Sequence, residues 1–211
     1  MLAHGRVPLA LHTLRSGAGP TLLVLHGLGE RTAPEPPPKT VDWPGSIHGL
    51  DFTGHGESGL PIGGGYAPEW LAADADVALA HLGPLSVWGI GLGGYVALLL
   101  LGSRPGDVGG IVIADGPGLV GGDDVLTPAL VGRPTSTTTP DPTAIAELSI
   151  DRRPAVYAIE QHEQVLAADP NGRIVVCAAE RPQWLGALIG RPGVIEADTT
   201  DAIGRLQVGP L

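Results

Sequence analysis

The chain has 211 residues, which is enough for one domain with a sizeable hydrophobic core. It carries 12 basic and 22 acidic residues, a net charge of -10, so nucleic acid and anionic membrane surfaces are excluded as expected partners. Cys177 is the single cysteine, which excludes an internal disulfide and a thiolate metal cluster.

The hydropathy of the chain predicts a cytoplasmic location. Residues 1–15 lack the basic start and apolar run of a secretory signal, and the longest apolar run, Tyr95–Leu101, is too short to span a bilayer. Lysine is nearly absent while Ala, Gly, Pro and Arg abound, a composition typical of a high-GC bacterial genome. We therefore expect a cytoplasmic bacterial protein.

The first third of the chain predicts three strands separated by turns. The strands are expected over Val7–Leu14, Thr21–Leu25 and Ser46–Leu50, and the second of them is apolar throughout, as a central parallel strand would be. Five prolines among fifteen residues exclude a regular helix over Glu30–Pro44. We expect that segment to be an extended surface loop bordering the mouth of a pocket.

The middle of the chain predicts a helix over Pro68–Leu82, then a buried strand over Leu85–Trp88. A glycine-rich turn follows, and an apolar helix over Tyr95–Leu101 ends before Pro105. A further buried strand is expected over Gly109–Ala114.

The last part of the chain continues the alternation of helices and strands. A loop is expected over Gly121–Thr143, helices over Pro142–Leu148, Pro154–Ala168 and Pro182–Ile189, strands over Arg173–Ala178 and Val194–Ala197, and a short tail over Thr199–Leu211. This alternation predicts an α/β fold: a doubly wound, mostly parallel sheet with helices on both faces, in a single domain over residues 1–211.

Three segments of the chain together resemble the α/β-hydrolase superfamily. The strand, sharp turn and helix of residues 85–105 resemble the nucleophile elbow G-x-S-x-G, with Gly89 and Gly93 at its flanking positions. Residues 26–29 resemble the HGxG segment after the third strand, and residues 51–58 resemble D-x-x-G-H-G-x-S. The resemblance implies a minimal lid within 116–172.

The same resemblance implies two backbone donors of an oxyanion hole and the loss of the catalytic triad. The donors would be the N–H groups of Leu28 and Leu92, beside His26 and Gly27. The nucleophile position holds Gly91, the acid position falls near Pro182 in place of aspartate, and no histidine follows His162 in the chain. We expect Gly91 to leave a small cavity between the two donors, with room for a water or a ligand carbonyl.

Four other side chains are candidates for chemistry at this site. Asp115 ends a strand at the expected catalytic edge, where it faces the pocket or caps a turn. His162 dips into the pocket from a helix or lies on a solvated helix face, and the second of these is the favoured interpretation. His26 and His55 follow buried strands and are interpreted mainly as hydrogen-bonded scaffold residues.

We expect no cofactor and no metal. Residues 89–94 match the dinucleotide-binding pattern G-x-G-x-x-G by letters, but no acidic residue ends the next strand at the usual distance of about 20 residues. No group of histidines and carboxylates has the spacing of metal ligands.

Two functions remain open at this point. The first is a pseudoenzyme that binds a small apolar or carbonyl-bearing ligand, or a protein partner. The second is a hydrolase or lyase without a covalent intermediate, in which the oxyanion hole polarises a carbonyl and a water, Asp115 or His162 moves the proton. A rate abolished by changing Asp115 or His162 would favour the second.

Overall fold

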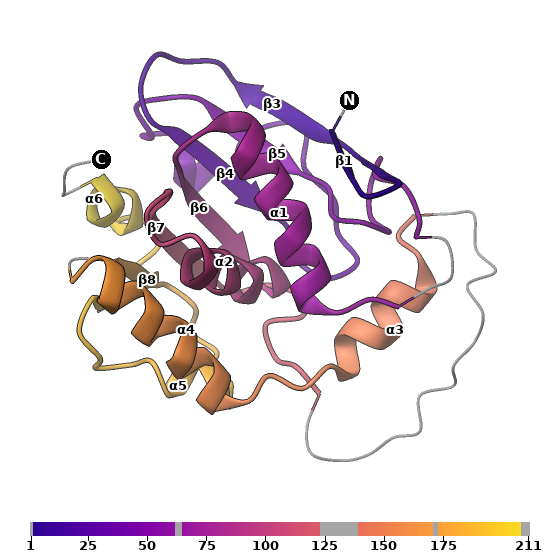
Figure 1. Cartoon of the computed structure of the whole chain (residues 1–211). Helices are drawn as coiled ribbons and strands as arrows, with labels where there is room; N and C mark the ends of the chain where they lie inside the picture. Colours follow the sequence, from indigo (N-terminus) through magenta and orange to yellow (C-terminus); the bar gives the residue numbers. More distant parts are fainter. Residues whose placement is uncertain (1, 62–64, 123–138, 171–172, 208–211) are drawn as a thin grey trace.

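A computed structural model of the chain describes residues 2–61, 65–122, 139–170 and 173–207, and contains a seven-stranded sheet of order β3-β5-β4-β6-β7-β8-β9 (Figure 1). β3 pairs antiparallel with β5, and every other neighbouring pair is parallel. The strands are β3 (Leu11–Arg15), β4 (Thr21–Leu25), β5 (Ile47–Leu50), β6 (Leu85–Ile90), β7 (Val108–Ala114), β8 (Ile174–Val176) and β9 (Val194–Glu196).

The two central strands β4 and β6 are buried on both faces, which is why their sequences are apolar apart from Thr21 and Ser86. β4 lies between β5 and β6, with Leu25 opposite Leu50 on one side and opposite Gly89 on the other. The strand ends that carry the candidate site therefore meet at the centre of the sheet.

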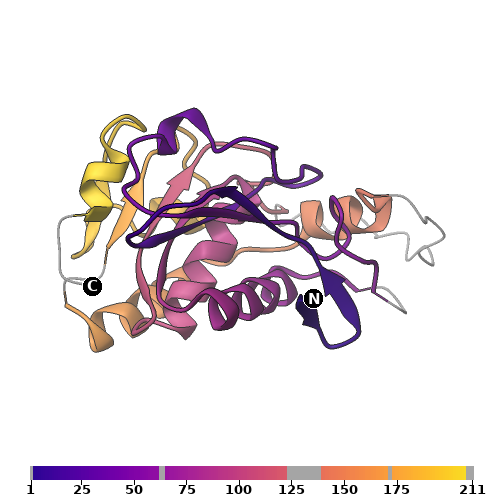
Figure 2. The same ribbon diagram turned by 90° about the horizontal axis from the view of Figure 1, so that it is seen from above.

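One face of the sheet is covered by α1 (Pro68–Leu82), α2 (Leu92–Ser103) and α4 (Ala155–Ala168), which share the larger hydrophobic core (Figure 2). The other face is covered by the short helix α6 (Ala202–Gln207) and by Trp43, next to the 3-10 turn η1 (Pro38–Thr40). The helices α3 (Pro142–Ile150) and α5 (Gln183–Gly186) lie towards the carboxyl ends of the strands. The predicted α/β fold with a mostly parallel sheet is confirmed.

The N-terminal strand prediction was wrong in its boundaries. Residues 7–14 are divided between β2 (Val7–Leu9) and β3, and β2 pairs antiparallel with β1 (Leu2–His4) in a separate two-stranded sheet. Gly5, with φ of 59°, makes the turn between β1 and β2. The chain leaves one sheet and enters the other at Ala10.

The C-terminal tail prediction was also wrong, because α6 lies within it. Ala202, Ile203 and Leu206 are buried and pack on the face of the sheet that Trp88 and Val112 occupy. A six-residue helix has little stability of its own, so its formation depends on this packing.

Other boundaries moved by a few residues. The elbow helix begins at Leu92, not at Tyr95, and the helix predicted over 182–189 is the shorter α5. Most of the loop predicted over 121–143, residues 123–138, lies outside the described residues. The proline-rich segment lacks a regular α-helix, as predicted, but its end is anchored, because Trp43 is buried and its indole N–H donates to Pro20 O at 2.8 Å.

Among the helices that the structure describes, none combines the length and hydropathy needed to cross a membrane. Among all the residues that the structure describes, no group of three or more His, Cys, Asp or Glu side chains is placed to hold a metal ion.

Candidate functional site

The candidate site begins at the sharp turn from β6 into α2. Gly91 has φ of 56° and ψ of -119°, a conformation that side-chain-bearing residues rarely adopt. The flanking glycines are required by close packing, because a Cβ at Gly89 would lie 2.4 Å from Gly93 O, and one at Gly93 would lie 2.3 Å from Leu25 O. The turn therefore has the tight geometry that the sequence implied.

The two backbone donors converge on one oxygen atom, which belongs to the chain itself. Leu28 N–H and Leu92 N–H each donate to Pro117 O, both at 2.9 Å. The carbonyl of Pro117 thus occupies the position that a substrate oxyanion would take between two such donors. The expectation of a small cavity there was wrong, because this carbonyl fills it.

The backbone around Pro117 also takes the space of the missing side chain. A Cβ at Gly91 would lie 2.2 Å from Pro117 O and 2.5 Å from Gly116 C. Gly118 is equally confined: its φ is 75°, and a Cβ there would lie 2.6 Å from the Leu28 Cβ. We call residues 115–119 the plug segment, because its backbone occupies the space that a side chain at position 91 would need.

The plug segment is held at both ends. At its start, the Asp115 carboxylate accepts hydrogen bonds from Ala179 N–H at 2.7 Å and Glu180 N–H at 3.1 Å. At its end, Leu119 O accepts hydrogen bonds from Trp184 Nε1 at 3.1 Å and Arg153 Nη1 at 2.7 Å. Asp115 therefore caps the turn after β8, which is the second of its two predicted interpretations.

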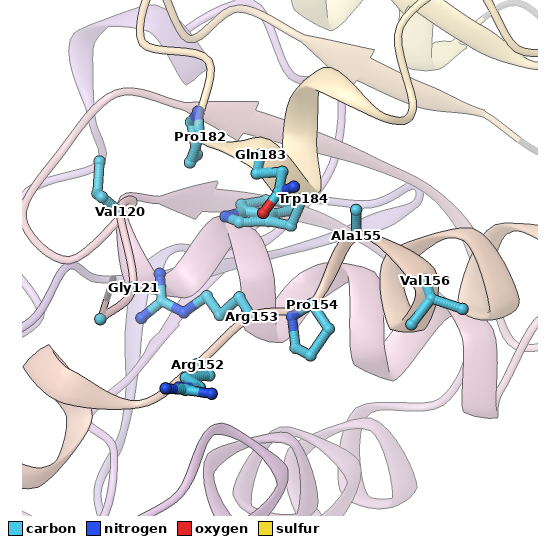
Figure 3. Close-up of a pocket in the computed structure, with 11 residues that line it drawn as sticks. Val120, Gly121, Arg152, Arg153, Pro154, Ala155, Val156, Pro182, Gln183 and Trp184 are labelled. Carbon is cyan, nitrogen blue, oxygen red and sulfur yellow. The ribbon is translucent and has the colours of Figure 1, made fainter. Parts of the chain in front are cut away.

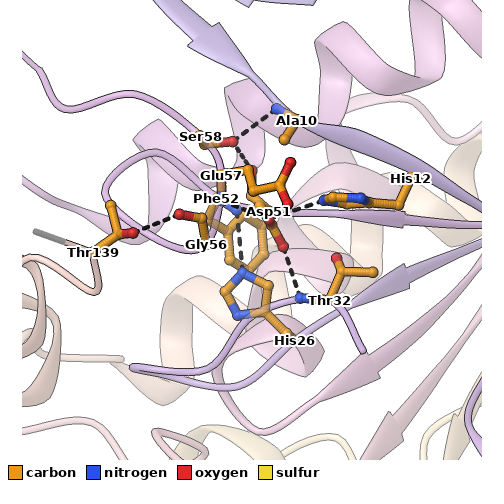
Figure 4. Close-up of polar contacts among 10 residues, drawn as sticks. All are labelled: Ala10, His12, His26, Thr32, Asp51, Phe52, Gly56, Glu57, Ser58 and Thr139. Carbon is orange, nitrogen blue, oxygen red and sulfur yellow. Dashed lines mark hydrogen bonds and ion pairs between the residues drawn. The ribbon is translucent and has the colours of Figure 1, made fainter. Parts of the chain in front are cut away.

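His26 uses both ring nitrogens in the scaffold, and Figure 4 shows the bond that Nε2 makes with Phe52 N–H. Phe52 N–H donates to Nε2 at 3.1 Å, so Nδ1 carries the proton and donates to Gly27 O at 2.8 Å. Gly27 N–H in turn donates to the Glu30 carboxylate at 3.0 Å. These bonds orient the loop that carries Leu28 and leave His26 no nitrogen for a ligand.

The D-x-x-G-H-G-x-S segment forms a largely buried hydrogen-bond network centred on Asp51 (Figure 4). Its carboxylate accepts hydrogen bonds from Thr32 N–H at 2.7 Å, Glu57 N–H at 2.8 Å and His12 Nε2 at 3.0 Å. Burial raises the pKa of Asp51, but these hydrogen bonds outweigh burial and lower it below its ordinary value. His55 is wholly buried, and its Nδ1 lies 3.1 Å from Thr53 O, so the segment acts as scaffold.

His162 does not lie on a solvated helix face, so the favoured interpretation of this residue was wrong. It is 1% exposed, because α4 packs against α2 and α5, and its Nε2 donates to Pro192 O at 2.8 Å. The imidazole thus points towards the turn before β9 and is absent from the walls of the cleft described next. The structure does not bring together the predicted site residues Asp115, His162 and Gly91.

A cleft of about 510 Å³ opens near the elbow, next to the residues that follow the plug segment (Figure 3). It lies between residues 120–122, the start of α4 and the start of α5. Its described lining residues are Val120, Gly121, Gly122, Arg152, Arg153, Pro154, Ala155, Val156, Pro182, Gln183 and Trp184. Gly91, Leu28 and Leu92 are not among them, so the cleft does not open onto the elbow.

Arg153 is the buried charge of this cleft and was missed by the sequence reasoning. The residue is 6% exposed, its guanidinium carbon lies 5.0 Å from the centre of the Tyr95 ring, and its Nη1 donates to Gly118 O as well as Leu119 O. Burial lowers the pKa of Arg153 to about 10, so the group stays charged at neutral pH. The only available signal was a pair of arginines between two predicted helices.

Buried His26 makes the fold sensitive to acid. Burial, followed by the neighbouring His55 imidazole, lowers the pKa of His26 to about 4, whereas an unfolded histidine titrates near 6.5. Below pH 6.5 the unfolded chain binds the extra proton and the folded chain resists it, so stability falls as the pH drops towards 4. At pH 5 the expected loss from this group is about 2 kcal/mol relative to pH 7.

Urea unfolding of the wild type and of His26→Gln at pH 7 and pH 5 measures this contribution. The difference in stability between the two proteins should shrink by about 2 kcal/mol on acidification. Taking the difference cancels the half-buried Asp151, whose pKa is raised to about 6 by burial and by Glu69 and which acts in the opposite direction. A difference that does not change with pH would contradict a neutral, buried His26.

Comparison with known proteins identifies the fold. No protein-family model and no curated protein sequence matches the chain. Among solved structures, the chain is similar to the thioesterase domain from the curacin biosynthetic pathway, with a TM-score of 0.64 and 14% identity over 97% of this chain and 94% of that one. It is also similar to a hypothetical protein of Pseudomonas aeruginosa PAO1, with a TM-score of 0.63 and 18% identity over 98% of this chain and 93% of that one.

The esterase RhEst1 from Rhodococcus sp. ECU1013 is a third similar structure, with a TM-score of 0.60 and 18% identity over 93% of this chain and 88% of that one. The chain therefore has the α/β-hydrolase fold. Identities this low establish the fold alone.

Proposed function

We propose that this protein is a non-catalytic binding protein built on the α/β-hydrolase fold. The observation that carries the proposal is the pair of hydrogen bonds from Leu28 N–H and Leu92 N–H to Pro117 O. An oxyanion hole stabilises a transition state only when its donors are free to meet the developing charge. Here both donors are satisfied by a carbonyl that is held in place at both ends of its segment.

The residues at the other catalytic positions support the same proposal. Acyl transfer by this fold needs a nucleophile, a histidine base and a carboxylate that orients the histidine. Gly91 offers no nucleophile, Pro182 stands near the acid position, and residues 198–201 read Asp-Thr-Thr-Asp where the family pattern has its histidine. We interpret this combination as the loss of triad chemistry in a fold that is otherwise intact.

The alternative of an enzyme without a covalent intermediate finds less support. That mechanism needs open oxyanion donors and a proton carrier beside them. The donors are occupied, both oxygens of Asp115 accept backbone hydrogen bonds, and His162 Nε2 is bonded to Pro192 O. Neither Asp115 nor His162 is among the described residues that line the cleft.

The 510 Å³ cleft beyond the plug segment is the proposed ligand site. Its volume lies within the range of about 300–1,000 Å³ typical of small-molecule pockets. Apolar side chains, among them Val120, Val156 and Trp184, share its lining with arginine and glutamine, the mixture that fixes an apolar body and orients a polar group. A small molecule is the ligand that suits this site.

Ester hydrolysis and amide exchange together test the proposal. The purified protein should hydrolyse p-nitrophenyl acetate and butyrate no faster than Asp115→Asn and His162→Gln variants do. The Leu28 and Leu92 amides should be protected from hydrogen exchange, because each donates to Pro117 O. Turnover well above background that is lost in either variant, or rapid exchange of both amides, would contradict a closed, inactive elbow.

A further inference from the structure

Arg153 presents an unused pair of donors at the proposed ligand site. Its Nη1 holds the plug segment, while Nε and Nη2 are buried and have no hydrogen-bond partner among the described residues. A buried guanidinium donor without a partner is unfavourable, so some group is expected to pair with it. The close-up of the cleft draws this side chain between Gly121 and Pro154 (Figure 3).

The chain itself shows which group fits this pair of donors. Arg104 uses the same edge to bind Asp76, with Nε 2.7 Å from Oδ1 and Nη2 2.9 Å from Oδ2. The Nε and Nη2 hydrogens of one guanidinium point in the same direction and match the two oxygens of a carboxylate. The vacant edge of Arg153 is therefore shaped for a carboxylate.

The lining of the cleft favours an anion as well, even though the Asp151 carboxylate lies close enough to Arg153 to interact with it electrostatically. The cleft includes the start of α4, a helix of 14 residues whose first turn contains no acidic residue and whose N-terminus has no side-chain cap. Uncapped N–H groups at a helix N-terminus attract negative charge. Although the whole chain has a net charge of -10, no described carboxylate lines the cleft.

We propose that the cleft binds a small carboxylate with an apolar body, and that Arg153 recognises the carboxylate through Nε and Nη2. The inference rests on the proposed function, since it assigns a ligand class to that site. The apolar body would lie against Val120, Val156 and Trp184. Because Nε and Nη2 are covered in this structure, binding includes a rotation of the outer Arg153 side chain towards the cleft. This rotation releases the Nη1 hydrogen bonds, and the bond from Trp184 Nε1 to Leu119 O keeps the end of the plug segment in place.

Three probes of equal chain length separate charge from apolar contact: octanoate, 1-octanol and octylamine. Each is titrated into isotope-labelled protein, following the Trp184 indole N–H and the Arg153 Nε–H by NMR. The Arg153 signal is assigned by its absence in Arg153→Lys. We expect octanoate to shift both signals and to bind at least about tenfold more tightly than octanol, with octylamine weakest.

Arg153 variants test whether this side chain recognises the carboxylate. Val156 variants test the charge preference of the cleft independently, in case the Arg153 variants do not fold. Arg153→Gln should weaken octanoate binding by at least about tenfold, and Arg153→Lys should fall between it and the wild type. Val156 is 61% exposed at the cleft, so Val156→Glu and Val156→Lys should fold. The first should weaken and the second tighten octanoate binding about three- to tenfold, with Val156→Gln as the neutral control.

Each outcome tests a different property of the protein. Equal affinity for octanoate and octanol at the Trp184 indole would overturn the assignment of an anionic ligand and leave a binding cleft in place. If octanoate bound every Val156 variant with the same affinity, or if saturating octanoate shifted neither the Trp184 nor the Arg153 NMR signal, the cleft would be ruled out as its binding site. Ester turnover, measured separately, addresses whether the elbow is inactive.

Discussion

A serine placed at Gly91 will not create a hydrolase, and it will destabilise the fold by about 2–5 kcal/mol. The backbone at this position has φ of 56°, which strains a residue with a side chain. Its Cβ would lie 2.2 Å from Pro117 O, so the plug segment must move, and with it the carbonyl that pairs with Leu28 N–H and Leu92 N–H. The new hydroxyl would still have no histidine to take its proton, because the chain has none beyond His162.

Urea unfolding and a p-nitrophenyl ester assay check this result on one preparation. Gly106→Ser is the matched control, because Gly106 is exposed, has no positive φ and has open space where a Cβ would be added. It should change stability by no more than about 0.5 kcal/mol. A Gly91→Ser protein as stable as the wild type would refute the tight contact with the plug segment, and fast ester hydrolysis would refute the missing base.

The second large effect is expected at Asp51, where asparagine should lower stability by about 2–4 kcal/mol. The substitution keeps the size of the side chain and replaces one acceptor oxygen by an NH2 group. That group cannot accept from Thr32 N–H, Glu57 N–H or His12 Nε2, all of which now point at the carboxylate. At least one partly buried donor would face another donor, which costs more than the loss of one hydrogen bond.

Asp76→Asn is the control for this prediction. Asp76 pairs with Arg104 on the surface, where both side chains are more than a third exposed, so asparagine there should cost no more than about 1 kcal/mol. The free energies of unfolding of both variants at pH 7 give the comparison. Equal losses at the two positions would mean that the Asp51 network contributes no more than a surface ion pair.

Most of the fold could be predicted because its signals are local. The apolar run of β4, the helical spacing of α1 and the glycine-rich turn at 89–94 each indicate one conformation within a few residues. The missed helix α6 shows where such signals end. Among its described side chains, Ala202, Ile203 and Leu206 are buried, and they pack on β7 and β8, strands that lie about 90 and about 30 residues earlier in the chain.

The candidate site was predicted in part for the same reason. The elbow, the loop that carries Leu28 and the Asp51 turn were found from short motifs, and the structure places them together at the centre of the sheet edge. The plug segment was not found, since Gly116-Pro117-Gly118 reads as an ordinary turn. Arg153 was missed because nothing in its neighbours indicates burial or an unused pair of donors.

By itself, then, the sequence determined the α/β architecture and the absence of a nucleophile at Gly91, since periodicity and residue identity are properties of the chain alone. Only the tertiary structure decided that the oxyanion donors are occupied and that the cleft lies beyond them. The Pro117 carbonyl meets two N–H groups from segments 25 and 89 residues away, at Leu92 and Leu28. Such a meeting depends on how the loops pack above the sheet, where no local sequence signal operates.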